Sequence, residues 1–144
     1  MRQMRNKKAF FNYDLDDHFE AGLVLKGDEI KAVRAGKVSL DGSFAKILYN
    51  AKRKPELWLV NAHLGSQTLS PTRSRKLLVH RHEINKLIGK LQTQGLTLVP
   101  TKIYLKKGTA KTTLALGRGR KAQDKRELIK KRDIERELRQ RAQK

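Results

Sequence analysis

Residues 117–144 place the tightest limit on the fold, because this stretch contains almost nothing that can join a hydrophobic core. It holds twelve Lys or Arg and five Asp or Glu residues. Its six apolar residues are too scattered to form a continuous core-facing stripe: Ala122, Leu128, Ile129, Ile134, Leu138 and Ala142. We therefore expect one compact domain over residues 1–117, followed by a basic C-terminal tail over residues 118–144.

The charge of the chain indicates a polyanionic partner. Its 144 residues include 34 Lys or Arg and 14 Asp or Glu, which gives a net charge of +20 at pH 7. Of these, 22 basic and 9 acidic residues precede residue 117, so the tail alone does not account for the excess. Neutralising phosphates with Lys and Arg releases counterions, and nucleic acid is therefore the favoured partner, with binding that weakens as salt rises.

An anionic membrane is the alternative polyanion, and the sequence disfavours it. No run approaches the roughly eighteen apolar residues of a spanning helix, and the basic start is followed by Ala9-Phe10-Phe11-Asn12 instead of a signal-peptide core. The tail lacks the Leu-rich and aromatic face of a membrane-surface helix. The absence of cysteine excludes disulfides and cysteine-ligated metal. We expect a cytoplasmic protein that does not bind membranes.

Short apolar or alternating runs bounded by turn residues predict strands. The runs are residues 11–15, 19–25, 38–40, 43–49, 57–60, 76–79, 96–105 and 110–116. The Asp41-Gly42 turn lies between the third and fourth runs and predicts a hairpin. Pro100 predicts an edge position or a bulge in the seventh run.

Two helices are predicted between these strands. Residues 28–34 have acids at the start and Arg34 at the end, as the helix dipole favours, and Gly36 closes the segment. A longer helix is indicated by an apolar stripe at i, i+3, i+4 and i+7, formed by Ile84, Leu87, Ile88 and Leu91 and ending before Gly95. Short strands with outer helices predict a mixed α+β fold, an OB-like antiparallel β-barrel with flanking helices.

The tail has the composition of a helix without a surface to pack on. Glu127 can pair with Lys131, and Glu135 with Arg139, but such pairs contribute only about 0.2–0.5 kcal/mol each. A helix of this length is marginal in water without tertiary contacts. We expect the tail to be disordered when free and helical on its partner. Gly117 and Gly119 are interpreted as a hinge in front of it.

No motif for covalent chemistry is present: the sequence lacks a P-loop, a dinucleotide-binding glycine pattern, HExxH, GxSxG and a cysteine nucleophile. We expect no catalytic residue, no cofactor and no metal. Two alternatives stay open, a metal site on His80 and His82 with Glu83, and an RNA-processing enzyme with its carboxylates on an acidic patch. The patch consists of Asp14, Asp16, Asp17 and Glu20. A strand-to-helix junction and a charge-balanced surface strand are the simpler interpretations.

Aromatic and basic residues bear on how RNA would be held. Trp58 and Phe44 can stack on bases, but both lie in apolar runs, which favours core packing. Basic residues gather in residues 52–54, 73–76 and 106–107 and in the tail. Clusters spread over loops and an arm favour recognition of a folded, phosphate-rich RNA over reading of a base sequence in a groove.

Several motifs follow one another in a fixed order over nearly the whole chain. The longest, FEAGLVLKGDEIKAVRAGK, spans residues 19–37. The others are Asn6-Lys7-Lys8-Ala9, Gly42-Ser43-Phe44, Asn61-Ala62-His63, RKLLVH at residues 75–80, GLTLVP at 95–100 and Asp124-Lys125-Arg126. Together they resemble the SmpB family, the SsrA-binding proteins of bacterial trans-translation.

The resemblance implies an OB-type barrel that binds the tRNA-like domain of tmRNA and performs no covalent chemistry. With elongation factor Tu and GTP acting on the same complex, it would deliver tmRNA to the A site of a stalled ribosome for rescue and tagging. The tail would lie on small-subunit RNA at the decoding centre and in the messenger channel, as a helix. A general RNA-binding or ribosomal protein with the same barrel and arm is the alternative.

The resemblance also implies sites. Glu20, Leu78 and His80 match positions of tmRNA binding, and Arg73, Arg75 and Lys76 are expected to hold its phosphates. The tail positions expected on the ribosome are Gly119, Arg120, Lys121, Gln123, Asp124, Lys125, Arg126, Lys130, Lys131 and Arg132. Gln123 stands where the family often has His or Tyr near a decoding-centre base, and Phe10 replaces a residue that is usually basic or polar.

Overall fold

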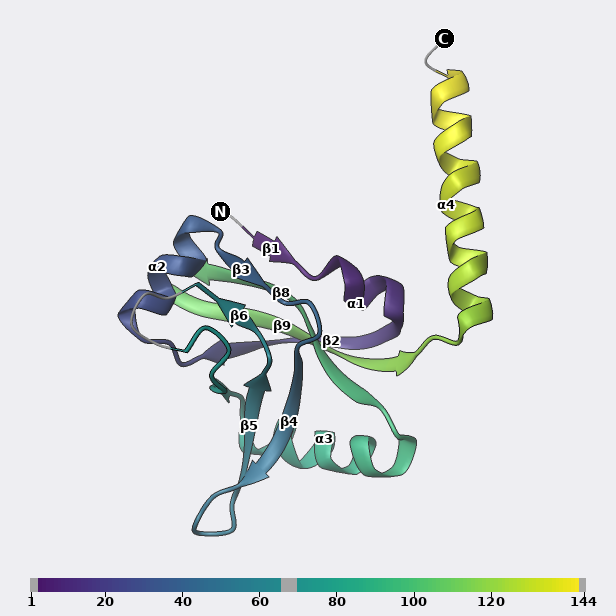
Figure 1. Ribbon diagram of the computed structural model, residues 1–144. Helices are drawn as coiled ribbons and strands as arrows, with labels where there is room; N and C mark the ends of the chain where they lie inside the picture. Colours follow the sequence, from purple (N-terminus) through teal and green to yellow (C-terminus); the bar gives the residue numbers. More distant parts are fainter. Residues whose placement is uncertain (1–2, 66–69, 143–144) are drawn as a thin grey trace.

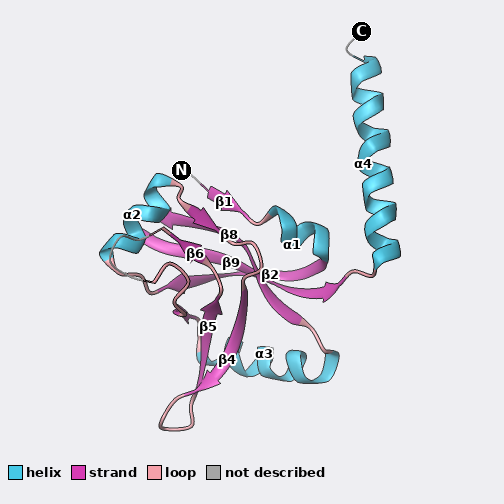
Figure 2. Cartoon of the chain, viewed as in Figure 1, coloured by secondary structure: helices cyan, strands magenta, loops and turns pink. Residues whose placement is uncertain are grey.

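Strands and helices are interleaved along the chain in the computed structural model, which describes residues 3–65 and 70–142 (Figure 1). The strands are β1 Gln3–Arg5, β2 Tyr13–Leu23, β3 Val38–Ser39, β4 Phe44–Tyr49, β5 Pro55–Val60, β6 His63–Leu64, β7 Arg75–Leu78, β8 Thr97–Lys106 and β9 Thr109–Gly119. The helices are α1 Lys7–Asn12, α2 Gly27–Ala35, α3 Arg81–Gln94 and α4 Ala122–Ala142. Figure 2 shows the helices around the strands, which is the mixed class that the sequence predicts.

Seven strands form one antiparallel sheet that closes on itself. Their hydrogen-bonded order is β1-β8-β4-β5-β7-β2-β9, and β8 also pairs with β9. The β8–β9 pairing closes the ring, and β1 lies beside β8 as an additional strand. Strand β8 pairs with β9 on one side. On its other side, the start of β8 pairs with β4 at Ala45, and its second half pairs with β1. The predicted mixed α+β class, with an antiparallel sheet and flanking helices, is confirmed, and so is the irregularity after Pro100.

The barrel interior is filled by aliphatic side chains. Leu57, Leu59, Ile103 and Leu114 are completely buried, and Leu87 of α3 packs into the same core. Burying a side chain of this size stabilises a fold by about 1.5–3 kcal/mol. The helix that carries Leu87 ends at Gly95, which has the left-handed φ of 61° expected of a helix terminus.

Trp58 and Phe44 do not belong to this core, so the expected core packing is wrong for both. Each is partly exposed, and neither is among the residues of the hydrophobic cluster or the apolar side chains packed against it. Strand β5 alternates strictly between buried and partly exposed positions from Leu57 onward. This alternation places Trp58 on the outer face of the barrel.

The N-terminal segment also differs from the sequence prediction. Residues 11–12, expected in a strand, end helix α1, and β2 then runs unbroken apart from an irregularity between Asp16 and Phe19. Asn6 explains the helix: its Oδ1 accepts from the Ala9 N–H at 3.2 Å, while its Nδ2 donates to the carbonyls of Leu40 and Pro100. The two long-range bonds fix the helix on the barrel, and they have no signature in the local sequence.

The Asp41-Gly42 turn does not form the expected hairpin. Strand β3 pairs with β6, whereas β4 pairs with β5 and β8. Gly42 nevertheless adopts a left-handed φ of 74°, and the Ser43 hydroxyl donates to the Leu40 carbonyl at 2.6 Å. The turn therefore leads the chain from the small β3–β6 sheet into the barrel.

Gly117 is a packing position within the sheet, and its interpretation as a hinge is wrong. It pairs with Leu15 on one side and Thr97 on the other. A Cβ at residue 117 would lie 3.0 Å from the Tyr13 ring and 3.1 Å from Leu15 Cδ2. A Cβ at Gly119, the last residue of β9, would meet nothing within 4 Å.

Helix α4 projects away from the barrel as a single element (Figure 1). Its large apolar side chains have little to pack on, since Ile129, Ile134 and Leu138 are 45%, 59% and 59% exposed. Over the described residues, no helix is both long and apolar enough to cross a membrane. The structure describes the helical form of the tail, and its disorder in the free protein stays a prediction.

Candidate nucleic-acid interface

Glu20 lies on the outer face of β2, where a tyrosine holds its carboxylate. The Tyr104 hydroxyl donates a short hydrogen bond to Glu20 Oε2, and Lys106 Nζ lies 3.9 Å from Oε1. The Tyr104 bond lowers the pKa of Glu20, and nearby lysines add to the effect. The carboxylate is thus ionised at neutral pH with 39% of the side chain exposed. It can accept hydrogen bonds from base or ribose donors.

Strand β7 brings two further predicted residues to the same outer face. Leu78 is 55% exposed and pairs with Gly22, two positions beyond Glu20 along β2. Lys76 is 41% exposed and binds Glu56 at 2.9 Å. Because residues two apart on a strand share a face, Glu20, Lys76 and Leu78 line one continuous surface.

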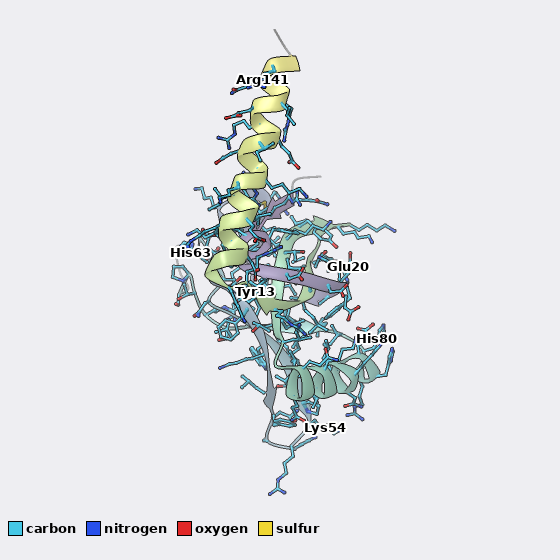
Figure 3. The ribbon with its side chains drawn as sticks, turned by 90° about the vertical axis from the view of Figure 1, so that its right-hand side faces the viewer. Tyr13, Glu20, Lys54, His63, His80 and Arg141 are labelled. Carbon is cyan, nitrogen blue, oxygen red and sulfur yellow. The ribbon has the colours of Figure 1, made fainter. Side chains whose placement is uncertain are left out.

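His80 follows β7 and starts helix α3. Its ring stacks on His82 with centroids 5.6 Å apart, and its side chain makes no capping hydrogen bond. Figure 3 shows His80 and Glu20 on the same side of the molecule. His82 lies in the first turn of α3 and is exposed, so the two histidines sit at a strand-to-helix junction and not on one strand face.

Two members of the acidic patch on β2, Asp17 and Glu20, are paired with lysines. Asp17 accepts from Lys90 Nζ at 2.9 Å, and this bond lowers the pKa of Asp17. Glu20 is held separately by Tyr104. Among the described residues, no three His, Asp or Glu side chains are grouped so that they could hold a metal ion.

Arg75 is a buried structural residue, and its expected contact with RNA phosphates is wrong. Both Arg75 and Glu29 are completely buried, and Arg75 Nε donates to Glu29 Oε2 at 2.7 Å. The other guanidinium nitrogens of Arg75 donate to the carbonyls of Ala62 and Pro71 at 2.6 and 2.8 Å. Because all its nitrogens are used inside the domain, Arg75 has none left for a ligand.

Arg73 shares the same carboxylate from the surface side. Its guanidinium makes two hydrogen bonds to Glu29, and 29% of the side chain stays exposed. Burial alone raises the pKa of Glu29, but hydrogen bonds from Arg73, the Lys26 backbone N–H and Arg75 together place that pKa below its ordinary value. Arg73 can therefore add positive charge to the surface only at its exposed edge.

The base of the tail is attached to helix α1. The Arg120 N–H donates to the Asn12 carbonyl at 2.8 Å, and Arg120 Nε donates to the Tyr13 carbonyl at 3.2 Å. The cationic groups of Lys125 and Arg132 lie 5.9 and 5.6 Å from the centre of the Phe11 ring. These contacts fix the first turns of α4 beside the barrel.

The remaining tail residues of the predicted site lie on α4 and face solvent. The exposed charged residues are Asp124, Arg126, Lys130, Lys131 and Arg132. The N–H of Lys121 donates to Asp124 Oδ2 at 3.3 Å, which closes the start of the helix. Gln123 belongs to the first turn of α4, and its side chain lies outside the part of the structure that is described.

Comparisons with known proteins identify the family. A model of the SmpB protein family matches residues 3–144. The chain belongs to the SmpB family. It is 48% identical over 146 residues to an SsrA-binding protein of Trichormus variabilis, covering 96% of this chain and 90% of that protein. It is 49% identical to the SsrA-binding protein of Geobacillus sp. over 140 residues, covering 93% and 87%.

A solved structure supports the same assignment. The chain is similar to one in the structure described as "tmRNA-SmpB: a journey to the center of the bacterial ribosome". The identity is 42%, the TM-score is 0.68, and the match covers 83% of this chain and 85% of that one. The family and the fold expected from the sequence motifs are therefore confirmed.

The structure sorts the residues carried over from the SmpB family into two groups. Glu20, Lys76, Leu78 and His80 lie on one side of the barrel, whereas the tail residues lie on a separate helix. Sequence reasoning missed Tyr104, which positions Glu20, and Phe11, which positions the tail. The local sequence of β8 carried no signal for this role of Tyr104, because its hydroxyl bonds to a residue 84 positions away.

Proposed function

We propose that this protein binds the tRNA-like domain of tmRNA through the barrel and delivers it to a stalled ribosome through the tail. The observation that supports the proposal is that Glu20, Lys76 and Leu78 share one outer face of the sheet, with exposed His80 directly after strand β7. It combines an ionised acceptor, a cation and an apolar contact, a set suited to a folded RNA with accessible ribose and base edges. Relatives named SsrA-binding proteins support this partner.

The tail would act at a different place, on the small ribosomal subunit. Three apolar side chains on α4, those of Ile129, Ile134 and Leu138, are exposed, and the helix carries many cations around them. An RNA-lined channel could neutralise those charges and surround the helix. From the family resemblance we extend the proposal to the decoding centre, the messenger channel and elongation factor Tu with GTP.

The test compares the affinities of the full-length protein for two folded RNAs. Affinity for the tRNA-like domain of tmRNA and for an unrelated folded RNA of equal length is measured at two salt concentrations. We expect tighter binding to the tRNA-like domain at both concentrations, and weaker binding to both RNAs at high salt. Equal affinities would show a general RNA-binding protein instead.

A further inference from the structure

Trp58 stands in the middle of a row of side chains on the outer face of the barrel. Its neighbours across the sheet are Lys46 on β4 and Lys76 on β7. The side chains before and after it on β5, Leu57 and Leu59, point into the core and are completely buried. A partly exposed indole is thus flanked by a lysine on each side.

Glu56 holds this row in place. It lies two positions before Trp58 on the same face and binds Lys76 Nζ at 2.9 Å. The hydrogen bond from Lys76 lowers the pKa of Glu56. The carboxylate is therefore charged at neutral pH. The Trp58 side chain is partly exposed on the same face, where a ligand can reach it.

The β4–β5 hairpin continues the same surface with three consecutive cations. Asn50 Oδ1 accepts the backbone N–H groups of Lys52 and Lys54 at 2.9 and 3.1 Å. The Arg53 N–H donates to the Asn50 carbonyl at 2.9 Å. All three basic side chains at the tip are exposed, and Figure 3 shows Lys54 at the end of the molecule away from Arg141. Asn50 thus organises the hairpin tip.

We propose that Trp58 is a stacking site for an unpaired nucleotide of tmRNA, with Lys46, Lys76 and the hairpin tip binding the adjoining phosphates. Proteins bind unpaired nucleotides by stacking the bases on aromatic rings, since every base has a π-face, and by placing cations beside the phosphates. The inference rests on the proposed function and extends its surface from Leu78 across β5 to β4.

The position of the row favours tmRNA over ribosomal RNA. Lys76 belongs both to this row and to the surface with Leu78, so an RNA seated on one reaches the other. The hairpin and helix α4 lie at opposite ends of the molecule (Figure 1). An RNA bound by the tail would therefore have to pass along the whole barrel to reach Trp58.

Trp58 is the only tryptophan in the chain, so its fluorescence reports this site alone. The full-length protein is titrated with the tRNA-like domain of tmRNA bearing a terminal fluorescein, which is excited directly so that its anisotropy measures total binding. A parallel titration with unlabelled RNA follows the indole emission. We expect the emission to be quenched along the same binding curve. Small-subunit RNA fragments should bind without this quenching.

Substitutions separate stacking from folding. Trp58→Leu keeps an apolar side chain without a π-face and should weaken binding by about fivefold to 100-fold, whereas Trp58→Phe should bind within about threefold of the original protein. Lys46→Gln should weaken binding, and Lys31→Gln on α2, an equal change of charge away from this face, should not. Circular dichroism checks that each variant is folded.

The outcomes distinguish the two proposals. If the anisotropy never rises, the proposed function fails. If anisotropy saturates while the indole emission is unchanged, tmRNA is bound but Trp58 is not its stacking site, and this inference is overturned. That wild-type titration decides the matter even if Trp58→Leu does not fold. Quenching by small-subunit RNA but not by tmRNA would also overturn it.

Discussion

Arg75 Nε donates a 2.7 Å hydrogen bond to Glu29 Oε2, and both side chains are completely buried beneath the surface where RNA was expected to touch Arg75. The pair joins α2 to β7, two elements that are separate in the sequence. A buried ion pair adds little net stability, but removing Arg75 would leave the buried Glu29 carboxylate with fewer partners and the Ala62 and Pro71 carbonyls without this donor. Arg75 therefore stabilises the fold by joining α2 to β7.

Arg75→Met should lower the free energy of unfolding by about 3–5 kcal/mol, because it leaves the Glu29 carboxylate with only Arg73 and a backbone N–H. Urea denaturation measures the change. Lys90→Met removes the exposed pair with Asp17 and should cost no more than about 1 kcal/mol. Similar small losses in both variants would mean that the Arg75 pair does not stabilise the domain as described.

Acid should destabilise the protein through the same carboxylate. The pKa of Glu29 in the folded state lies below the ordinary value of 4.5. A lowered folded pKa gives stability that is present above pH 4.5 and is lost as the pH falls through the folded pKa. Unfolding measured between pH 7 and pH 3 should show this fall, and the ¹³C shift of the Glu29 carboxyl should titrate below 4.5. Titration at or above 4.5 would contradict it.

Gly117 and Gly119 offer a matched pair for the close approach of β9 to β2. Gly117→Ala places a methyl group 3.0 Å from the Tyr13 ring, and overpacking of this kind costs about 1–3 kcal/mol. Gly119→Ala meets open space and should change stability by less than about 0.5 kcal/mol. Thermal unfolding of the two variants checks this. A hinge role for both glycines would instead leave stability unchanged and impair only the tail.

Phe11 should hold the base of the tail helix. Phe11→Leu removes the ring beneath Lys125 and Arg132, and each exposed cation–π contact is worth about 0.5–1 kcal/mol. Amide hydrogen exchange over residues 120–132 should accelerate. The neighbouring Phe10→Leu removes a cation–π contact with Arg5 instead and serves as the control. Equal exchange rates in the two variants would show that the tail is not anchored through Phe11.

Elements with local signals were predictable from the sequence. The stripe of Ile84, Leu87, Ile88 and Leu91 gave α3 correctly, because a helical period is written in neighbouring residues. The family motifs likewise led to the exposed Glu20, Leu78 and His80. The β3–β6 pairing and the contacts of Asn6 were missed, because they join segments whose association depends on the closed barrel.

Burial of charged residues was the other failure. Arg73, Arg75 and Lys76 read as one basic cluster, yet a strand sends adjacent side chains to opposite faces. Arg75 shares the inner face with Leu77, and that alternation was the available signal. Trp58 was misplaced for the related reason that an aromatic residue in an apolar strand does not reveal its face. Because adjacent strand residues point to opposite faces, the leucines on either side, Leu57 and Leu59, would have indicated that Trp58 faces outward.

The most direct test of the account ends the chain after Lys121, which keeps the two hydrogen bonds of Arg120 to the Asn12 and Tyr13 carbonyls and removes α4. Binding to the tRNA-like domain and tagging on stalled ribosomes are measured for the truncated and full-length proteins. We predict that binding is retained within about threefold, since the removed charges act mainly as non-specific attraction, whereas tagging is lost. Loss of tmRNA binding, or tagging that persists without α4, would contradict the assignment of tmRNA binding to the barrel and of action on the ribosome to the tail.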